Sequence, residues 1–316
     1  MPRITTLTLN PTIDLASEAA AVHPIRKIRT FAERQDPGGG GVNVARVVQE
    51  LGGETLAVIL AGGVTGRFLE DLLDEGGIPR QTVPIAGRTR ISQTVLDRST
   101  GQEYRFVAEG PRMAEAEWQA ALAALAELRG GWLVASGSLA PGVPEDFYAR
   151  LARRAGEAGT RFVLDTSGEA LRDALEAGGL ALIKPSLGEF EALLGHKLPE
   201  PEAQEKAALK LARSGKVEMV ALTLGRDGAL LATPEGTLRL PALDVEVRGA
   251  VGAGDSFLAA MTLALARGRS PRDAFAWGVA AGAAAVSNAG TAHPRREEVA
   301  ALRRRITAVA MEGDAL

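Results

Sequence analysis

The strongest chemical signal in the chain is a carboxylate beside two glycines, directly before an apolar helix. Asp255 follows Gly252, Ala253 and Gly254 and opens a helix predicted over residues 255–266. Glycine lets the backbone turn tightly, so that consecutive N–H groups can point toward one anion. The positive end of the helix dipole adds to this attraction. The segment therefore predicts an anion hole for a transferring phosphoryl group, with Asp255 able to accept a proton from an attacking hydroxyl. The alternative is an N-capping Asp without catalysis.

A second glycine-rich segment, Gly38 to Gly41, leads into a helix predicted over residues 42–51. Its glycines allow a ligand to approach the backbone, and Asn43 carries an amide in the first turn of that helix. A simple turn is the alternative interpretation. The chain contains neither G-x-G-x-x-G nor G-x-x-x-x-G-K-[ST]. A dinucleotide fingerprint and a P-loop are therefore excluded.

Short apolar runs, suited to strands buried on both faces of a parallel sheet, alternate with helical patterns. The predicted strands are 4–9, 56–60, 132–135, 162–164, 180–183 and 219–222, with a hairpin over 229–240. The predicted helices are 42–51, 65–75, 114–127, 144–158, 203–214, 255–266 and 271–288. This alternation predicts a three-layer α/β/α sandwich with a mostly parallel sheet, in a single domain over residues 1–316.

Two segments fall outside the alternation, residues 15–36 and 88–110. Neither has a helical period, and the second holds two strand-like runs around the turn Ser99-Thr100-Gly101. We expect these segments to form a small β-sheet that projects from the domain as a lid. Ligands would bind beneath it, at the carboxyl ends of the parallel strands.

Composition excludes several classes of protein. The formal net charge of -3 argues against a nucleic-acid-binding surface. The chain has no cysteine, which rules out disulfides, thiolate nucleophiles and zinc–thiolate sites. No apolar run reaches the roughly 18 residues of a membrane-spanning helix, and no signal-peptide core follows Met1. We therefore expect a cytoplasmic protein without nucleic-acid or membrane partners.

The glycine loop before Asn43 and the later segment Gly252 to Asp255 resemble the ribokinase-like (PfkB) family of carbohydrate kinases. The resemblance covers essentially the whole chain and is strongest to the phosphofructokinase branch. Its further motifs are Thr8 to Asp14, Gly38 to Arg46, Glu103 to Val107, Ser136 to Gly142 and Asp165 to Ala170. It implies a ribokinase-like fold and a phosphotransferase that uses ATP and Mg²⁺. The implied acceptor is an alcohol group of a small sugar phosphate, with fructose 6-phosphate converted to fructose 1,6-bisphosphate.

The same resemblance implies a role for each matching residue. Asp255 matches the catalytic base, and the amides of Gly252, Ala253 and Gly254 match the anion hole. The positions implied in substrate binding are Asp14, Lys27, Gly39, Gly40, Asn43, Arg90, Arg105 and Ser138. Among these, Lys27 and Arg90 match positions that bind the substrate's own phosphate.

A second set of matching positions implies a nucleotide site. Its members are Lys184, Ser186, Thr223, Gly225, Gly228, Gly254 and Asn288. Glu189 matches the acid of the family's N-x-x-E motif and would act on Mg²⁺ indirectly, through water. Ser186 replaces the Asn of that motif, and its shorter hydroxyl would require an additional water in the magnesium network.

Other readings of the sequence stay open. The segment Asn10 to Asp14 is as close to 1-phosphofructokinases and tagatose-6-phosphate kinases, although those enzymes usually carry Lys in place of Gly40. A sugar-phosphate sensor without catalysis is a second possibility, supported only by Ser186. A nicotinamide-dependent oxidoreductase is a third, opposed by the missing fingerprint. Because lids of this family often pair across a two-fold axis, the resemblance also implies a homodimer formed through the lid.

Overall fold

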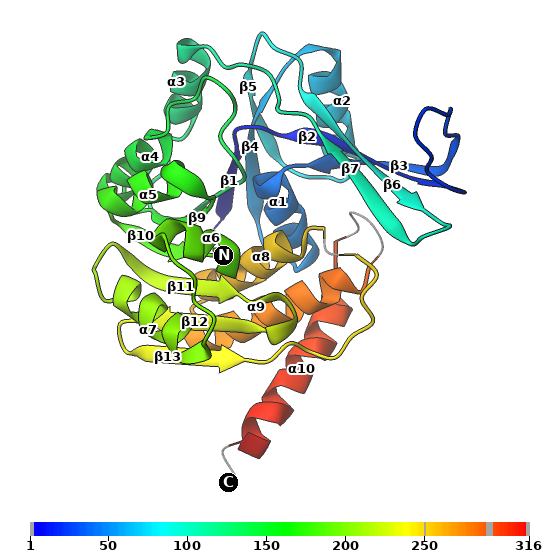
Figure 1. Cartoon of the computed structure of the whole chain (residues 1–316). Helices are drawn as coiled ribbons and strands as arrows, with labels where there is room; N and C mark the ends of the chain where they lie inside the picture. The colour runs from blue at the N-terminus through cyan, green and yellow to red at the C-terminus, as the bar shows by residue number, and fades with distance from the viewer. Residues whose placement is uncertain (1–2, 250, 289–292, 314–316) are drawn as a thin grey trace.

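The computed structural model describes residues 3–249, 251–288 and 293–313, with side chains of the last helix described as far as Ile306. Within these ranges, nine strands form the central sheet in the order β13-β12-β11-β10-β9-β8-β1-β4-β5 (Figure 1). Their bounds are β1 Ile4–Thr8, β4 Thr55–Ala61, β5 Arg80–Pro84, β8 Trp132–Ser136, β9 Arg161–Asp165, β10 Leu180–Ile183, β11 Val217–Thr223, β12 Ala229–Thr233 and β13 Gly236–Leu240. Neighbouring strands from β5 to β11 are parallel, and the β12–β13 hairpin continues the sheet in antiparallel pairing.

Helices cover both faces of this sheet. One face carries α3 Glu115–Ala124, α4 Phe147–Glu157, α5 Gly168–Ala177, α6 Leu187–Leu194 and α7 Pro201–Ala212. The other carries α1 Gly40–Glu50, α2 Gly63–Glu75, α8 Ala253–Ala266, α9 Pro271–Val286 and α10 Arg296–Gly313. In β8, Leu133 and Ala135 pack into the first core while Trp132 and Val134 pack into the second. Burial on both faces explains why these strands are continuous apolar runs in the sequence, and the predicted three-layer sandwich is confirmed.

The sequence patterns missed α5, α6 and β5. The two helices are short, with 10 and 8 residues, and each lies in a connection between strands of the sheet. Strand β5 lies at the edge of the sheet and is polar, with only Val83 buried. The predicted helix over 114–127 ends at Ala124, and the one over 144–158 begins at Phe147. None of the helices in the described ranges is long and apolar enough to cross a membrane.

A second sheet of four strands projects from the sandwich, at the right of Figure 1. Its order is β3-β2-β6-β7, with β2 Thr12–Ala19, β3 Thr30–Gly38, β6 Arg90–Asp97 and β7 Gln102–Val107. The small sheet expected from the sequence is thus present, although β2 begins at Thr12, before the predicted start at residue 15. Ile13 and Leu15 pack with Leu69 of α2, which fixes the root of this lid sheet on the domain.

The carboxyl ends of the parallel strands bring polar residues to one edge of the sandwich. Ser136 ends β8 and Asp165 ends β9, and the two are register partners in adjacent strands. Lys184 directly follows β10. The topology therefore places a hydroxyl, a carboxylate and an ammonium group side by side before any long-range side-chain contact is considered.

Candidate active site

Asp255 lies in the first turn of α8, where two side chains orient its carboxylate. Its Oδ2 accepts a 2.9 Å hydrogen bond from Asn43 Nδ2, and its Oδ1 accepts one of 3.3 Å from Ser136 Oγ. Gly252 caps the helix in the left-handed conformation, with φ 74°, and no side chain caps the first turn. The first N–H groups of α8 are therefore open to an anion beside an oriented carboxylate.

The pKa of Asp255 is raised to about 6, mainly by burial and also by the negative charge of Asp165. The hydrogen bond from Asn43, the charge of Lys184 and the hydrogen bond from Ser136 oppose this rise in pKa. A carboxyl group with such a pKa is mostly ionised at neutral pH and yet accepts a proton more readily than an ordinary Asp. These are the properties required of a general base working near neutrality.

A second carboxylate, that of Asp165, lies beside the first and is paired with a buried cation. Lys184 Nζ is 3.3 Å from Asp165 Oδ2, and Ser136 Oγ is 3.4 Å from the same oxygen. Burial raises the pKa of Asp165, while Lys184 opposes the rise. Burial by itself lowers the pKa of Lys184, but the attraction of Asp165, Asp255 and Glu189 outweighs it, so that this pKa is raised. Lys184 therefore supplies a permanent positive charge at neutral pH.

Lys184 also lies against the start of α8. A Cβ atom placed on Gly254 would be 3.1 Å from Lys184 Nζ, so the ammonium group and the first-turn amides face the same space. Ser136 is packed just as closely, because a Cβ on Gly40 would be 2.2 Å from its Oγ. Any larger residue in place of Gly40 would displace the hydroxyl that contacts Asp255. The Lys typical of 1-phosphofructokinases at this position is thus incompatible with the present packing.

The motif around Ser186 is engaged in local contacts. Glu189 Oε2 accepts hydrogen bonds from the backbone N of Ser186 at 2.7 Å and from its Oγ at 2.8 Å, which forms a capping box at the start of α6. The Thr223 amide donates to Pro185 O at 3.0 Å, so the end of β11 lies next to this cap. Lys184, Ser186, Glu189 and Thr223 therefore occur together at one edge of the sheet.

The remaining positions matched to the nucleotide differ in their surroundings. Gly225 begins the short 3₁₀ helix η1, Gly225–Asp227, and a Cβ on it would meet no atom within 4 Å. A Cβ on Gly228 would lie 2.1 Å from Leu240 O, so close packing against the end of β13 already requires a glycine there. Asn288 follows α9, where its Nδ2 donates to Ala284 O at 3.3 Å. The described contacts do not bring Asn288 to the Asp255 network.

The lid sheet brings a different group of charges together. The pKa of Asp14 is raised to about 6, mainly by burial and also by the charge of Asp36, whereas the charges of Arg90, Arg105 and Arg46 oppose the rise. Arg90 donates hydrogen bonds of 2.9 Å to Ala108 O and to Asn10 O. Its buried Nε has no hydrogen-bond partner among the described residues. Asp14, Arg90 and Arg105 therefore form one cluster, as the sequence-based assignment requires.

Two predicted substrate residues lie outside this cluster. Lys27 is exposed in the segment between β2 and β3, and Ser138 is exposed after the end of β8. Within the described part of the chain, neither side chain has a hydrogen bond or an ion pair. The arrangement of one chain does not bring them to Asp14 and Arg90.

Sequence reasoning named Ser136 and Asp165 only as members of motifs and missed their contacts with Asp255 and Lys184. The available signal was their position, because each is the last residue of a strand in the parallel sheet. Gly39, in contrast, was named as a site residue before the structure was considered. The family resemblance implied it as a substrate-binding position, and it caps α1 with φ 105°, a conformation that favours glycine.

Comparison with known proteins agrees with this geometry. The model of the pfkB family carbohydrate kinases matches residues 8–298. This chain belongs to the pfkB family. The ATP-dependent 6-phosphofructokinase isozyme 2 of Mycobacterium tuberculosis is 42% identical over 303 residues, which cover 94% of this chain and 88% of that protein. A 1-phosphofructokinase of Xanthomonas campestris is 34% identical over 265 residues, covering 82% and 83% of the two chains.

Solved structures support the same family. Phosphofructokinase-2 from Escherichia coli, in complex with fructose-6-phosphate, matches with a TM-score of 0.92 and 37% sequence identity. The match covers 97% of this chain and 100% of that chain. The family resemblance inferred from the sequence motifs is confirmed.

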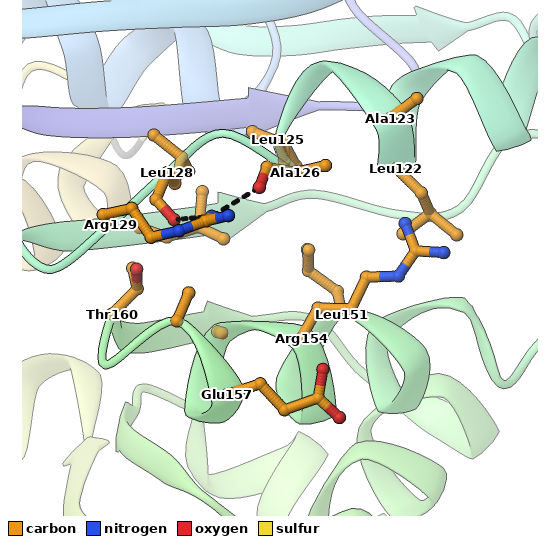
Figure 2. A pocket seen from close by; sticks show the side chains of 13 residues that line it. Leu122, Ala123, Leu125, Ala126, Leu128, Arg129, Leu151, Arg154, Glu157 and Thr160 are labelled. Carbon is orange, nitrogen blue, oxygen red and sulfur yellow. Dashed lines mark hydrogen bonds between the residues drawn. The ribbon is translucent and has the colours of Figure 1, made fainter.

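The pfkB chain also has a cavity that is remote from these residues. It measures about 460 Å³ and lies between the end of α3 and α4, as Figure 2 shows. Leu and Ala side chains form most of its lining, with Arg129, Arg154 and Glu157 among the polar residues. Arg129 donates to the carbonyl oxygens of Ala126 and Leu128. No member of the Asp255 network lines it, so this cavity is separate from the candidate active site.

Proposed function

We propose that this protein is an ATP-dependent 6-phosphofructokinase that converts fructose 6-phosphate to fructose 1,6-bisphosphate. The observation that carries the proposal is the oriented carboxylate of Asp255 beside the uncapped first turn of α8. The choice of sugar is supported by the higher identity to a 6-phosphofructokinase isozyme 2 than to a 1-phosphofructokinase. It is also supported by the similarity to phosphofructokinase-2 in complex with fructose-6-phosphate.

In the proposed reaction, the free primary hydroxyl of the sugar lies between Asp255 and the γ-phosphorus of ATP. The hydroxyl oxygen attacks the phosphorus in line while Asp255 accepts its proton. The new O–P bond forms as the bond to the bridging oxygen breaks, and that bonding pair leaves with ADP. The amides of Gly252, Ala253 and Gly254 and the charge of Lys184 stabilise the phosphoryl oxygens, so that catalysis depends on positioning and electrostatics.

The substrate-binding roles follow from the lid cluster. Asp14, Gly39 and Asn43 would bind sugar hydroxyls, while Gly40 leaves room for Ser136. Arg90 would bind the substrate's phosphate through its planar guanidinium group, assisted by Arg105, Lys27 and Ser138. Closure of the lid sheet would exclude water and limit the hydrolysis of ATP. On the nucleotide side we assign Lys184, Ser186, Thr223, Gly225, Gly228 and Asn288.

The residues near Lys184 fit a magnesium ion held mainly by nucleotide phosphates and water. Among the described residues, no group of three or more His, Cys, Asp or Glu side chains could hold a metal ion by itself. Mg²⁺ commonly keeps several waters and binds through one or two carboxylates and substrate phosphates. Glu189, with one carboxylate oxygen already bonded to Ser186, would hold such an ion through water. When bound, the ion would neutralise phosphate charge.

We also propose that two copies of the chain pair through their lid sheets. The support is a set of apolar side chains exposed on the lid, with exposed fractions of 46% for Phe31, 60% for Phe106 and 58% for Val107. Exposed apolar side chains on a sheet that projects from the domain favour an interaction surface there. Phe106→Asp should shift sedimentation toward the monomer. Val64→Asp, at an equally exposed (60%) position on α2, should leave it unchanged. A wild-type protein that sediments as a monomer at all concentrations would reject the lid dimer.

The function is tested by measuring ADP release with ATP and Mg²⁺ for several acceptors. Fructose 6-phosphate, fructose 1-phosphate, tagatose 6-phosphate and fructose are compared with wild type, Asp255→Asn and the surface control Asp71→Asn. We expect the highest kcat/KM for fructose 6-phosphate, and a fall of about 10²–10⁴-fold in kcat for Asp255→Asn alone.

The possible results separate the remaining hypotheses. If another sugar phosphate gives the highest kcat/KM, the kinase chemistry stands and the substrate assignment is wrong. If none is turned over while fructose 6-phosphate binds, the chain is a sugar-phosphate sensor. If Asp255→Asn retains full kcat, Asp255 is not the base.

A further inference from the structure

A cavity of about 290 Å³ lies at the C-terminal ends of α1 and α8, whereas the candidate active site lies at their N-terminal ends. Asn43 and Asp255 occupy the first turns of these helices, whereas Leu51 and Arg267, the C-cap residues, line the cavity. At about 1.5 Å per residue, Arg267 lies about 18 Å along α8 from Asp255. It is therefore a separate site on the same two helices.

The lining of this cavity combines an apolar floor with three arginine side chains. Leu51, Leu263 and Trp277 belong to the apolar part, and Arg267, Arg269 and Arg296 to the charged part. The three arginines come from the end of α8, the α8–α9 connection and the start of α10. Burial lowers the pKa of Arg267, and the charges of Arg296 and Arg269 lower it further, because three like charges face one another.

Nearby acidic groups do not neutralise all three of these charges. Asp273 lies 3.6 Å from Arg269 but is also bonded to Arg303 at 2.5 Å. Glu50 accepts a 3.3 Å hydrogen bond from the backbone N of Arg296. Among the residues that the structure describes, Arg267 donates to the carbonyl oxygens of Leu51 and Gly52, at 3.2 and 2.8 Å.

In the described part of the chain, the guanidinium of Arg296 has no carboxylate partner. Positive charge therefore exceeds negative charge around this cavity.

We propose that this cavity binds a small organic monophosphate, whose phosphate is held by Arg267, Arg269 and Arg296. Guanidinium groups match the geometry of phosphate oxygens and bind them with charge-assisted hydrogen bonds. The apolar floor and Trp277 cover the organic part of the ligand. The volume is close to the lower limit, about 300 Å³, of ordinary small-molecule pockets, which selects a compact ligand.

The position of the cavity makes the ligand a regulator of the proposed kinase activity, and this part of the inference rests on that proposed function. Arg267 joins the C-terminal ends of α1 and α8 through its bonds to Leu51 and Gly52. A phosphate that draws Arg267 toward Arg296 competes with those two hydrogen bonds. The packing of α1 against α8 changes as a result. Their other ends carry Asn43 and Asp255, joined by the 2.9 Å hydrogen bond. The ligand therefore shifts kcat/KM without entering the active site.

Binding is tested with phenyl phosphate as the probe, against inorganic phosphate and phenol, by calorimetry on the full chain with fructose 6-phosphate and ADP saturating the active site. We expect one phenyl phosphate per chain with a Kd of about 1 mM or tighter, and weaker binding of the two fragments. Arg296→Gln should weaken the affinity by about tenfold or more. Arg304→Gln, an exposed position on the same helix, should leave the affinity unchanged. Absence of binding outside the active site, or equal binding by Arg296→Gln, overturns the proposal.

The regulatory part has its own readout. Saturating phenyl phosphate should change kcat/KM for fructose 6-phosphate at least about threefold in wild type and Arg304→Gln, but not in Arg296→Gln. Binding without a change in kcat/KM overturns the regulatory role. Because calorimetry does not require turnover, binding by Asp255→Asn supports the cavity even if the proposed kinase function fails.

Discussion

The carboxyl edge of the central sheet and the lid sheet both hold an Asp with a pKa near 6, but they hold it in different ways. Asp255 accepts hydrogen bonds from Asn43 and Ser136 and lies near buried Lys184. For Asp14, the rise in pKa is opposed by the charges of Arg90, Arg105 and Arg46. Hydrogen bonds from two side chains orient the carboxylate of Asp255. The carboxylate of Asp14 interacts with its neighbours through charge, and among the described residues no side chain donates a hydrogen bond to it.

This difference indicates that the chemistry is preorganised and that recognition is completed later. The residues around Asp255 already contact one another in the free chain. Lys27 and Ser138 remain exposed, and Arg90 uses two of its nitrogens on backbone carbonyls. We therefore expect substitutions at the sheet edge to change kcat, and substitutions in the lid to change KM for the sugar phosphate.

The largest predicted effect concerns the stability of Asp255→Asn. The pKa of Asp255 is raised from 3.8 in the unfolded chain to about 6 in the fold, so ionisation disfavours the folded state. The penalty is absent below pH 3.8, grows between these two pKa values and is complete above about pH 6. Asp255→Asn should therefore raise the free energy of unfolding by at most about 3 kcal/mol above pH 6. Urea unfolding at pH 4.5 and pH 7.5 measures this, and an equal effect at both pH values would contradict it.

In the lid, Arg90→Lys should raise KM for fructose 6-phosphate by about 10–30-fold, because an ammonium group loses the bidentate contact with phosphate. We expect kcat and KM for ATP to change by less than about threefold. Arg88→Lys, at a neighbouring exposed position, serves as the control in steady-state kinetics. If Arg90→Lys instead lowers the free energy of unfolding and leaves KM for fructose 6-phosphate unchanged, Arg90 serves only to bind the carbonyl oxygens of Asn10 and Ala108.

Ser136 and Ser138, which are two residues apart at the end of β8, separate the proposed roles in chemistry and recognition directly. Ser136→Ala removes a buried donor to Asp255 and should lower kcat by about tenfold, with little change in KM for either substrate. Ser138→Ala should raise KM for the sugar phosphate and leave kcat unchanged. Initial-rate measurements on both variants provide the test. If both serines affect the same parameter, the proposed division between chemistry and recognition is wrong.

The smallest effect is expected at Ser186. Its capping box with Glu189 predicts a loss of about 1 kcal/mol in the free energy of unfolding for Ser186→Ala. Ser270, which accepts a 3.2 Å hydrogen bond from Asp273 N at the start of α9, is a matched control for capping alone. KM for magnesium-bound ATP should rise by less than about threefold in either variant. A fall in kcat for Ser186→Ala with stability unchanged would instead assign Ser186 to the magnesium network.

The sequence by itself determined the α/β class, the mostly parallel sheet and the two glycine-rich helix starts. These features follow from local rules, because buried parallel strands are short apolar runs and glycine before a helix marks a tight turn. The glycine-rich segments themselves pointed to Asp255 and Asn43, and the family resemblance added Lys184. Local patterns failed where an element was short or lay at an edge, as for α5, α6 and β5.

Only the tertiary structure decided which side chains meet. The contacts of Ser136 and Asn43 with Asp255 span 119 and 212 residues of sequence, and Asp165 meets Lys184 because their strands are neighbours in the sheet. Among the described residues, Lys27 and Asn288 show no contact with the groups with which the family resemblance had associated them. The reason is physical: spacing along the chain fixes local conformation, whereas burial, distance and the resulting pKa values depend on how distant segments pack.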